Sequence, residues 1–588
     1  MTIAPQTLPE RLSARAQDTP EAVGYLFRDT SGSWQETRWK DVAKTVATLA
    51  AAFGELGLKT GDRVAIMLPT SPNWDYCHLA ALACGAIAVG LDVHDAPGNL
   101  HHVLATTTPR AVIAADIGTL DALSAHCQPP EIRIVAEGEP KPGVLTLSSL
   151  LRSGSPPRPA PPLPSPDDTA TIVFTSGSTG KPKGIAYSHR QILLACDALA
   201  THFTSIRHEA RFVCWLPLSN LFQRILNVFA LSCGASTFFV DRPEQLMRLL
   251  PEIRPTLFVG VPRFFEKLHA GIMAELDRKP LPVRAVANAA WNVGQRIASA
   301  QRAGHGASLP DRLLAPVARR ILSPLRALMG PDLQFMASGS APLPLWLMER
   351  FHGLGWLVLE AYGVSENVIP IAINTPDAYR FGSVGRPLPG NELVIAEDHE
   401  LLVRGPGVSL QYAKASPTDS GHDECGHLHT GDYARIDEDG FVWLEGRKSE
   451  VFKTSTGRRV APSPIEAELK KLSYVEHAIV VGQGRPFPLA LLVISPQHPI
   501  AGRLGTADAM SQIRQDAVAN SARFPDFQRP GVLLVTTHPF SVASGELTAN
   551  LKLRRPAIEA RFAAQIESAY RIACHSRQSN RPTIVVDP

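Results

Sequence analysis

The part of the chain best suited to chemistry is a polar loop rich in glycine, serine and threonine. The loop reads Thr175–Ser176–Gly177–Ser178–Thr179–Gly180–Lys181–Pro182–Lys183–Gly184. Glycine lets a backbone approach an anion closely, and consecutive N–H groups in such a turn form a concave anion-binding surface. The hydroxyl groups add neutral donors, and Lys183 adds a positive point charge suited to phosphate. The sequence therefore predicts a phosphate-binding loop.

This loop is not a Walker A motif, which requires Gly-x-x-x-x-Gly-Lys-Ser/Thr before a helix. Here only two residues separate Gly177 from Gly180, and Pro182 follows the first lysine. A generic stretch of this composition is more often a polar surface loop. The complete ten-residue string favours phosphate binding over that interpretation.

Alternating helices and strands are expected to position the loop. Apolar residues between Val42 and Leu56 recur at helical spacing, and Gly57 ends that pattern. Residues 63–68 are typical of a buried strand, residues 78–88 of an apolar helix, and Thr171–Phe174 of a strand leading into the loop. This alternation predicts a layered α/β domain.

Two features divide the rest of the chain. Residues 155–166 contain seven prolines, which cannot sit inside a helix or a central strand, and they indicate an extended surface connector. From Val451 a smaller unit is predicted. It has a helix over Ile465–Leu472 and strands over Ala478–Val481 and Leu489–Ile494.

Length and composition fit a multidomain globular enzyme of 588 residues, 45% of them apolar and 19% charged. The net charge of +3 is small and does not favour nucleic acid as a partner. The eight cysteines include no C-x-x-C pair, which favours reduced thiols in the cytoplasm over a disulfide framework or a zinc site. Because no secretory signal and no run of 18 apolar residues occurs, at most peripheral contact with a membrane is expected.

The polar loop closely resembles the signature loop of the adenylate-forming superfamily, which includes acyl-CoA synthetases, luciferases and adenylation domains. In that family the loop grips the β- and γ-phosphates of ATP. Five further segments resemble the other family motifs, in the family's order. They are Ser338–Pro344, an adenine-side turn; Glu360–Asn367, a "YGxTE" motif; Thr430–Asp432, a "TGD" motif; Gly446–Glu450, a hinge motif; and Gly545–Arg555, the C-terminal motif with the catalytic lysine.

The resemblance implies a role for each matching residue. Tyr362 stacks on adenine, Ser365 replaces the usual threonine beside the phosphate, and Glu366 holds Mg²⁺. A carboxylate suits this hard cation, which takes oxygen ligands from proteins and phosphates. Asp432 accepts the ribose hydroxyls, and Arg447 also reaches the ribose.

By alignment with the C-terminal motif, Lys552 is the catalytic lysine. A cation is needed because negative charge builds on the α-phosphate as a carboxylate attacks it. Arg554 and Arg555 are competitors for this role. The complete set of expected site residues follows from the matches. The catalytic residues are Lys552, Glu366 and Lys183; the metal ligands are Thr175 and Glu366; the nucleotide-binding residues are Thr175, Ser176, Gly177, Ser178, Thr179, Gly180, Gly339, Ser340, Ala341, Tyr362, Gly363, Ser365, Asp432 and Arg447.

The implied fold is α/β, with a large N-terminal adenylate-forming domain of layered subdomains over residues 1–448. A small mobile α+β domain over residues 449–588 carries the catalytic lysine. The implied reaction uses ATP and Mg²⁺ to convert a carboxylic acid to acyl-AMP, and then transfers the acyl group to coenzyme A. In relatives the small domain rotates about a hinge residue that is usually aspartate or lysine; here that position is Ser449.

Three segments resemble the long-chain fatty acyl-CoA synthetase branch of the family. They are Leu216–Arg224, Pro255–Arg263 and Val480–Pro486. In the first, Asn220 replaces a histidine beside the acyl path and Gln223 replaces a glutamate, which leaves the chain length of the acid open. Val259, Val261 and Phe264 are candidates for lining an apolar slot, and are equally consistent with strand core.

Four alternatives remain at this stage. The chain could be an acyl-AMP ligase that loads an acyl-carrier protein, a ligase for aryl or other unusual acids, or a ligase that closes a lactone. A non-catalytic nucleotide-binding module is the alternative from another class. A non-catalytic module would not need to keep every catalytic and nucleotide-binding residue. This chain has all five of Lys183, Glu366, Asp432, Arg447 and Lys552.

Overall fold

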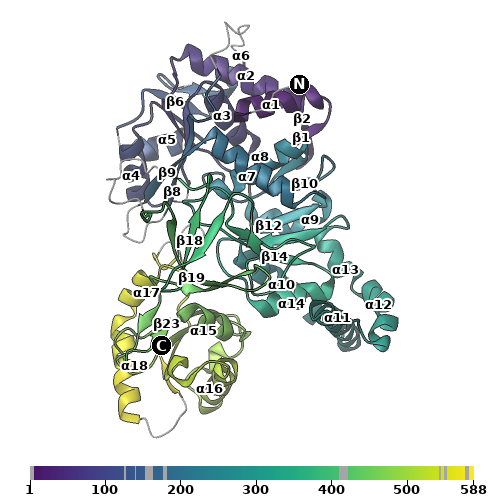
Figure 1. Cartoon of the computed structure of the whole chain (residues 1–588), viewed down its shortest axis with the longest axis vertical. Coiled ribbons are helices and arrows are strands. Elements are labelled where there is room, and N and C mark those ends of the chain that lie inside the picture. Colours follow the sequence, from purple (N-terminus) through teal and green to yellow (C-terminus); the bar gives the residue numbers. More distant parts are fainter. Residues whose placement is uncertain are drawn as a thin grey trace. The chain divides into compact units, whose positions relative to one another are not determined.

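The computed structural model describes residues 6–93, 95–124, 128–139, 141–152, 163–175, 182–409, 421–541, 544–547, 553–576 and 582–587. The chain is α/β and forms two compact units, whose elements are labelled in Figure 1. The larger unit comprises Met1–Leu343, Leu347–Leu393 and Val403–His429. The smaller comprises Pro344–Trp346, Val394–Leu402 and Thr430–Pro588. The boundary predicted between residues 448 and 449 rests on the rotation that the family resemblance implies, and it stays a prediction.

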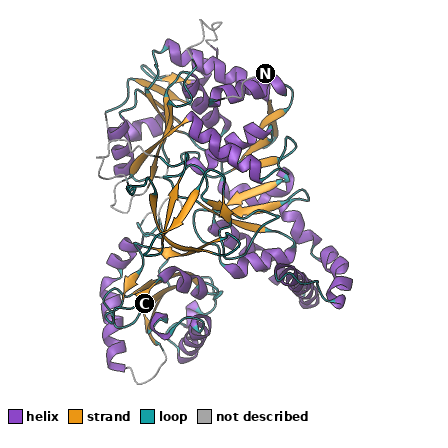
Figure 2. Ribbon diagram, in the orientation of Figure 1, coloured by secondary structure: helices purple, strands orange, loops and turns teal. Residues whose placement is uncertain are grey.

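A seven-stranded sheet in the larger unit carries the predicted phosphate loop. Across the sheet the strands are β7 (Leu145–Thr146), β6 (Ile132–Val135), β5 (Ala111–Ala114), β3 (Arg63–Met67), β4 (Ile87–Gly90), β8 (Thr169–Thr175) and β9 (Lys183–Ser188). Neighbouring strands are parallel except for β8 and β9. Ile66 and Ile113 are fully buried, as expected for parallel strands between helices. Figure 2 shows purple helices beside these orange strands.

The predicted elements of this region are confirmed, with one shift. The helical pattern between Val42 and Leu56 corresponds to α2 (Trp39–Glu55), whose apolar face is buried. The bounds predicted for the next helix, residues 78–88, are wrong, because α3 spans Pro72–Ala83. Gly85 adopts a left-handed φ of 73°, which ends the helix and leads the chain into β4. The apolar run was therefore two elements.

Two further sheets complete the larger unit. One contains β10 (Arg211–Cys214), β11 (Ser236–Phe239), β1 (Val23–Arg28) and β2 (Trp34–Arg38), in that order; the other contains β12 (Leu257–Gly260), β13 (Phe335–Ser338), β14 (Val358–Tyr362), β15 (Ala372–Ile373) and β16 (Arg386–Pro387). β12, β13 and β14 are mutually parallel. Their carboxyl ends therefore share one edge, which is where open α/β sheets bind ligands.

The smaller unit takes in most of one sheet and all of another. The first is β17 (Glu392–Ile395), β18 (Glu400–Arg404), β19 (Leu428–Ile436) and β20 (Val442–Arg447); the second is β23 (Val475–Val481), β24 (Leu489–Ile494), β25 (Val532–Thr536) and β26 (Thr583–Val586). β23 and β24 confirm the two predicted strands, and α15 (Pro462–Leu469) confirms the helix, three residues earlier at each end. Alternate residues of β24 enter two separate apolar clusters, so this sheet is covered on both faces.

Among the described helices, none combines the length and the apolar composition that crossing a bilayer requires.

Candidate functional site

The predicted phosphate loop connects two strands of the seven-stranded sheet. β8 ends at Thr175 and β9 begins at Lys183, and these two residues lie opposite each other in the antiparallel pair. Beside Lys183, the Nε2 atom of His102 hydrogen bonds with the carbonyl oxygen of Pro182 at 3.0 Å. Residues 176–181 lie outside the described part of the chain; they include the predicted Ser176, Gly177, Ser178, Thr179 and Gly180. The structure thus fixes where the loop starts and ends.

The predicted adenine-side turn follows β13, at the shared carboxyl edge of β12, β13 and β14. The Gly339 N–H donates to the carbonyl oxygen of Gly260 at 3.2 Å, which ties the turn to the end of β12. Ser340 adopts a left-handed φ of 73°, and both Ser340 and Ala341 are exposed. Strained backbone of this kind at a non-glycine residue is often found at functional sites.

Glu360 of β14 holds the far end of this turn, and sequence reasoning gave it no role. Its side chain is buried, and its Oε1 atom accepts a 2.9 Å hydrogen bond from the Leu343 N–H. Burial raises the pKa of Glu360 to about 7, although the hydrogen bond from Leu343 opposes that shift. Two residues further on, Tyr362 ends β14 with its side chain buried, and Gly363 is exposed.

The segment with Ser365 and Glu366 is anchored to β9 by two side chains that sequence reasoning also missed. The buried hydroxyl of Tyr187 donates to the carbonyl oxygen of Ser365. Ser409 donates its N–H to the carbonyl oxygen of Glu366 at 2.8 Å and its hydroxyl to the carbonyl oxygen of Ala186 at 3.0 Å. The predicted metal-binding segment is therefore tied to the strand that begins at Lys183. The only sequence signal for Tyr187 is its place two positions after Ile185, on the same face of β9.

The two predicted ribose-binding residues lie together in the smaller unit. Asp432 on β19 and Arg447 on β20 are partners in the antiparallel pair, and Nε of Arg447 lies 2.9 Å from Oδ1 of Asp432. Asp432 is 5% exposed, and its N–H donates to Oγ1 of Thr430 at 3.1 Å. Gly431 adopts a φ of 73°, which allows this tight turn. The structure thus brings the "TGD" and hinge motifs together.

The predicted catalytic lysine, Lys552, lies outside the described residues, and the structure describes the chain up to Leu547 and from Leu553. Leu547 and Leu553 form an antiparallel bridge, and the Arg554 N–H donates to the carbonyl oxygen of Glu546 at 2.7 Å. This pairing brings the two ends of the segment that contains Lys552 close together.

Arg555, one competitor for the role of Lys552, is already engaged. Its two terminal nitrogens each lie 2.8 Å from a carboxylate oxygen of the buried Glu466, and one also donates to the carbonyl oxygen of Val480 at 3.2 Å. A bidentate pair of this geometry holds a guanidinium in place. Arg554 is exposed. The ion pair with Glu466 argues against Arg555 as a mobile cation.

The residues of the predicted long-chain segment Leu216–Arg224 form part of a buried polar network. The Gln223 amide donates to Oδ1 of Asn227 at 3.0 Å, and the Asn227 amide donates to Oδ2 of Asp75 at 2.9 Å. Arg224 donates to Oγ1 of Thr171 at 2.6 Å. Gln223 also accepts a 3.2 Å hydrogen bond from the Leu216 N–H, and through Asn227 it is linked to Asp75 of α3, so we assign it a structural role.

The candidate acyl-lining residues divide between core and surface. Phe264 packs against Trp215 and Phe258, with ring centroids 5.5 and 4.5 Å apart. Val259 is also buried, whereas Val261 is partly exposed and caps α10 (Pro262–Asp277). Phe264 and Val259 therefore belong to an aromatic and aliphatic core, and Val261 is the better candidate for contact with a substrate.

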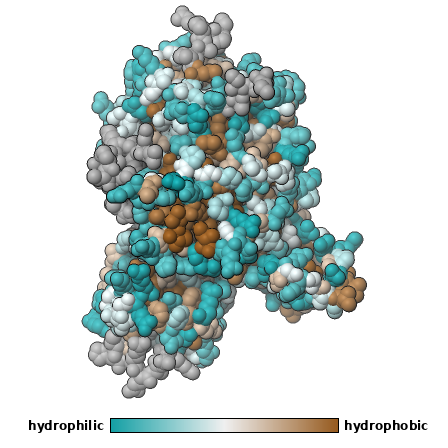
Figure 3. All heavy atoms as spheres, viewed as in Figure 1, coloured by the Kyte–Doolittle hydropathy of each residue, from teal (hydrophilic) through white to brown (hydrophobic). Residues whose placement is uncertain are grey.

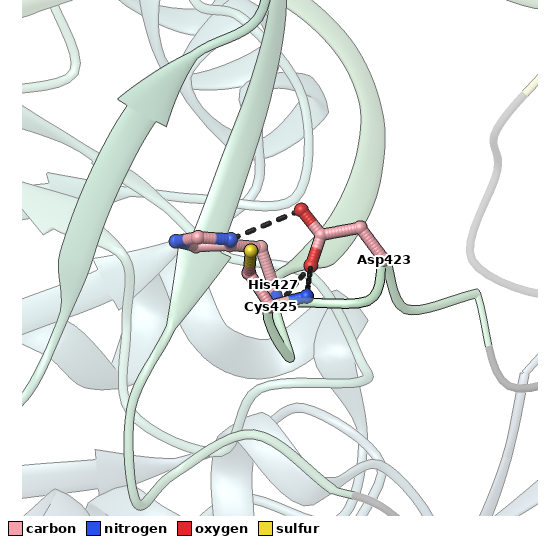
Figure 4. Close-up of side chains that lie close together, drawn as sticks. All are labelled: Asp423, Cys425 and His427. Atoms are coloured by element: carbon pink, nitrogen blue, oxygen red, sulfur yellow. Dashed lines mark hydrogen bonds and ion pairs between the residues drawn. The ribbon is translucent and has the colours of Figure 1, made fainter.

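Asp423, Cys425 and His427 form a close cluster of residue types that bind transition metals (Figure 4). However, Oδ1 of Asp423 accepts hydrogen bonds from the N–H groups of Cys425 and His427, at 2.9 and 2.8 Å, and Oδ2 lies 3.0 Å from Nδ1 of His427. The backbone hydrogen bond from His427 lowers the pKa of Asp423. Both carboxylate oxygens thus close a turn just before β19, and we assign the cluster a structural role.

Two family models match the chain over most of its length. The model described as "AMP-binding enzyme" matches residues 12–413, and that described as "AMP-binding enzyme C-terminal domain" matches residues 450–573. The long-chain-fatty-acid–CoA ligase FadD15 of Mycobacterium bovis is 30% identical, covering 94% of this chain and 95% of that protein. The long-chain-fatty-acid–CoA ligase heimdall of Drosophila melanogaster is 26% identical, covering 97% and 95%.

Solved structures share the fold. The anthranilate CoA ligase AuaEII, in complex with anthranoyl-AMP, aligns with a TM-score of 0.74 at 20% identity, covering 96% of this chain and 98% of that one. The adenylation domain of a carboxylate reductase from Mycobacterium chelonae aligns with a TM-score of 0.77 at 22% identity, covering 97% and 92%. Both alignments extend over the larger and the smaller unit.

Proposed function

Because the chain belongs to the AMP-binding enzyme family, we propose that it is an AMP-forming acyl-CoA synthetase for medium- or long-chain fatty acids. One observation carries this proposal: relatives named long-chain-fatty-acid–CoA ligases align with 94–97% of this chain. The enzyme would join the acid to AMP, release pyrophosphate, and then transfer the acyl group to the thiol of coenzyme A.

In the first half-reaction a carboxylate oxygen attacks the α-phosphorus of ATP, and the bond from that phosphorus to the bridging oxygen of the β-phosphate breaks. Catalysis of phosphoryl chemistry rests mainly on positioning and charge stabilisation. We assign Lys183 and the loop that precedes it to the leaving pyrophosphate. We assign Lys552 to the negative charge that builds on the α-phosphate.

Glu366 is the proposed carboxylate ligand of Mg²⁺, with Thr175 contributing near the phosphates. A partly exposed carboxylate on an anchored backbone fits a cation that takes few protein ligands and keeps phosphate oxygens in its shell. Bound Mg²⁺ would supply charge neutralisation on the phosphates. The bonds from Tyr187 and Ser409 would keep this segment in register with β9.

The second half-reaction is proposed to require rotation of residues 449–588. The backbone just before them is firmly held, because Nζ of Lys448 lies 2.7 Å from Oδ2 of Asp398 and 2.8 Å from Oε2 of Glu400. Ser449 follows in an exposed turn. A rotation would therefore be absorbed at Ser449, as expected for a hinge at the end of a regular element.

The direct test is pyrophosphate release by the purified enzyme with ATP, Mg²⁺ and a panel of fatty, aryl and short-chain acids. We expect acid-dependent pyrophosphate release that is strongest with medium- or long-chain fatty acids, and multiple turnovers only when coenzyme A is added. Turnover with an acyl-carrier protein but not with coenzyme A would instead identify a carrier-protein ligase. Silence with every acid would favour a non-catalytic nucleotide-binding module.

The role of Lys552 can be separated from that of its neighbours. We expect Lys552→Ala to abolish adenylate formation while thiolation of preformed acyl-AMP continues at nearly the normal rate. Arg554→Gln is the matched control, because it removes an adjacent exposed cation, and it should leave both half-reactions intact. Equal loss of both half-reactions in Lys552→Ala would contradict the assignment.

A further inference from the structure

Exposed apolar side chains gather on one helical hairpin of the larger unit. The hairpin consists of α11 (Leu281–Arg302) and α12 (Leu309–Ile321). In the part of the chain that the structure describes, fifteen large apolar side chains are exposed, and seven of them lie here. These seven are Leu281, Val283, Val286, Leu309, Leu313, Leu314 and Val317. The three most exposed in the whole set are Leu313, Leu281 and Leu309, at 78%, 74% and 73%. Such a concentration marks an interaction surface.

The hairpin is firmly attached, so its exposure is not a consequence of loose packing. The buried indole of Trp291 donates to the carbonyl oxygen of Arg350 at 2.7 Å. Within the hairpin, Arg296 of α11 pairs with Asp311 of α12 at 2.5 Å. Figure 1 shows both helices side by side, and Figure 3 shows brown apolar atoms over α12.

The orientation of α12 is the reverse of that of an ordinary surface helix. The buried residues of α12 are Asp311, which pairs with Arg296 of α11, and the small Ala318. Leu309, Leu313 and Val317 recur every four residues, so they share one face, and that face points to solvent. The outward leucines contribute little to the core of the protein. Contact with an apolar surface outside the protein would explain their placement.

The same hairpin is strongly basic. Residues 281–321 contain six arginines and one acidic residue, Asp311, so the hairpin carries a net charge of +5 against +3 for the whole chain. Arg312, Arg319 and Arg320 are exposed, and none of them has an ion pair with another described residue. Helices with apolar residues among arginines bind at the interface of anionic bilayers, where the leucines enter the headgroup boundary and the arginines meet lipid phosphates.

We propose that the α11–α12 hairpin docks this enzyme on the surface of an anionic lipid membrane. This role rests on the proposed function, because docking would bring the enzyme to the membrane in which fatty acids dissolve. Docking itself is measured without ATP or an acid, so its failure can be distinguished from a failure of the proposed function. Nucleic acid would satisfy the arginines but would leave the leucines exposed to water, and the membrane is therefore the favoured partner.

The test is co-sedimentation of the full-length protein with vesicles of pure phosphatidylcholine or of phosphatidylcholine with a third of phosphatidylglycerol. We expect binding to the anionic vesicles that weakens with salt. Arg319→Gln/Arg320→Gln should reduce partitioning about 30-fold, from the contribution of two basic side chains near such a surface. Leu309→Ser/Leu313→Ser should reduce it at least about tenfold, through the lost burial of two leucines.

Matched controls keep the experiment decisive. Arg248→Gln/Arg503→Gln makes the same charge change at exposed arginines outside the hairpin, and Leu163→Ser removes an exposed leucine elsewhere. Both should bind within about twofold of the parent protein, since they leave the hairpin unchanged. The proposal is overturned if the parent protein ignores anionic vesicles, or if the hairpin variants bind as well as the controls. It is also overturned if light scattering shows that the leucine face instead joins two copies of the chain.

Discussion

The hydroxyl of Tyr187 provides a sharp test of how the nucleotide site is positioned. This hydroxyl donates from β9 to the carbonyl oxygen of Ser365, and the Tyr187 side chain is 1% exposed. Tyr187→Phe removes the donor, keeps the ring, and leaves the carbonyl oxygen of Ser365 without that partner. One hydrogen bond contributes about 0.5–1.5 kcal/mol. If that energy holds Ser365 and Glu366 in register for ATP, kcat/KM for ATP should fall by about 2- to 12-fold.

Tyr474→Phe is the matched control, because Tyr474 is 3% exposed and its hydroxyl donates to Oδ2 of Asp516 at 2.9 Å in the smaller unit. Both variants should lose about 1 kcal/mol in urea unfolding, since each loses one hydrogen bond. Only Tyr187→Phe should change initial rates of pyrophosphate release as ATP is varied at saturating fatty acid. If the two variants have the same kcat/KM for ATP, the anchoring role of Tyr187 is refuted.

Three further predictions concern charges. Burial raises the pKa of Asp75 from 3.8 to about 6, so its contribution to stability is complete below about pH 4 and is lost as the pH rises through 6. Asp75→Asn is neutral at every pH, so its free energy of unfolding in urea, relative to that of the parent, should rise by roughly 3 kcal/mol from pH 4 to pH 7. A difference that does not change with pH would contradict this prediction. Asp432→Ala should raise KM for ATP about 10- to 100-fold by removing charge-assisted ribose hydrogen bonds, and an unchanged KM would remove Asp432 from the nucleotide site. Glu466→Gln should lower the free energy of unfolding by about 3 kcal/mol, because it leaves the guanidinium of Arg555 without its carboxylate. The control Arg554→Gln should change the free energy of unfolding by less than about 0.5 kcal/mol. Similar values for the two variants would argue against a stabilising ion pair between Glu466 and Arg555.

The parts of the fold that the sequence predicted are those with local signals. Periodic apolar residues predicted α2, and the apolar runs predicted β3, β8, β23 and β24, because burial on a face or on both faces leaves a pattern within one element. The helix over residues 78–88 was misplaced because an apolar run does not reveal where a helix gives way to a buried strand. Only the left-handed Gly85 marks that change.

The parts of the candidate site that could not be predicted depend on contacts between distant segments. Asp432 and Arg447 were expected together from motifs, and the structure places them 2.9 Å apart. Tyr187 and Ser365 are 178 positions apart in the chain, and Asp75 and Asn227 are 152 apart. Nothing local in the sequence indicates that a tyrosine in one strand will hold a loop after another. Such pairings follow from the topology of the sheets.

The most direct test of the central claim is exchange of labelled pyrophosphate into ATP by the purified protein with Mg²⁺. Exchange requires ATP and an acid to be bound in the site at the same time. It reports adenylate formation in the absence of coenzyme A. We predict exchange that depends on added fatty acid and disappears in Lys552→Ala. Absence of exchange with every acid, under conditions in which the protein is folded, would contradict the account.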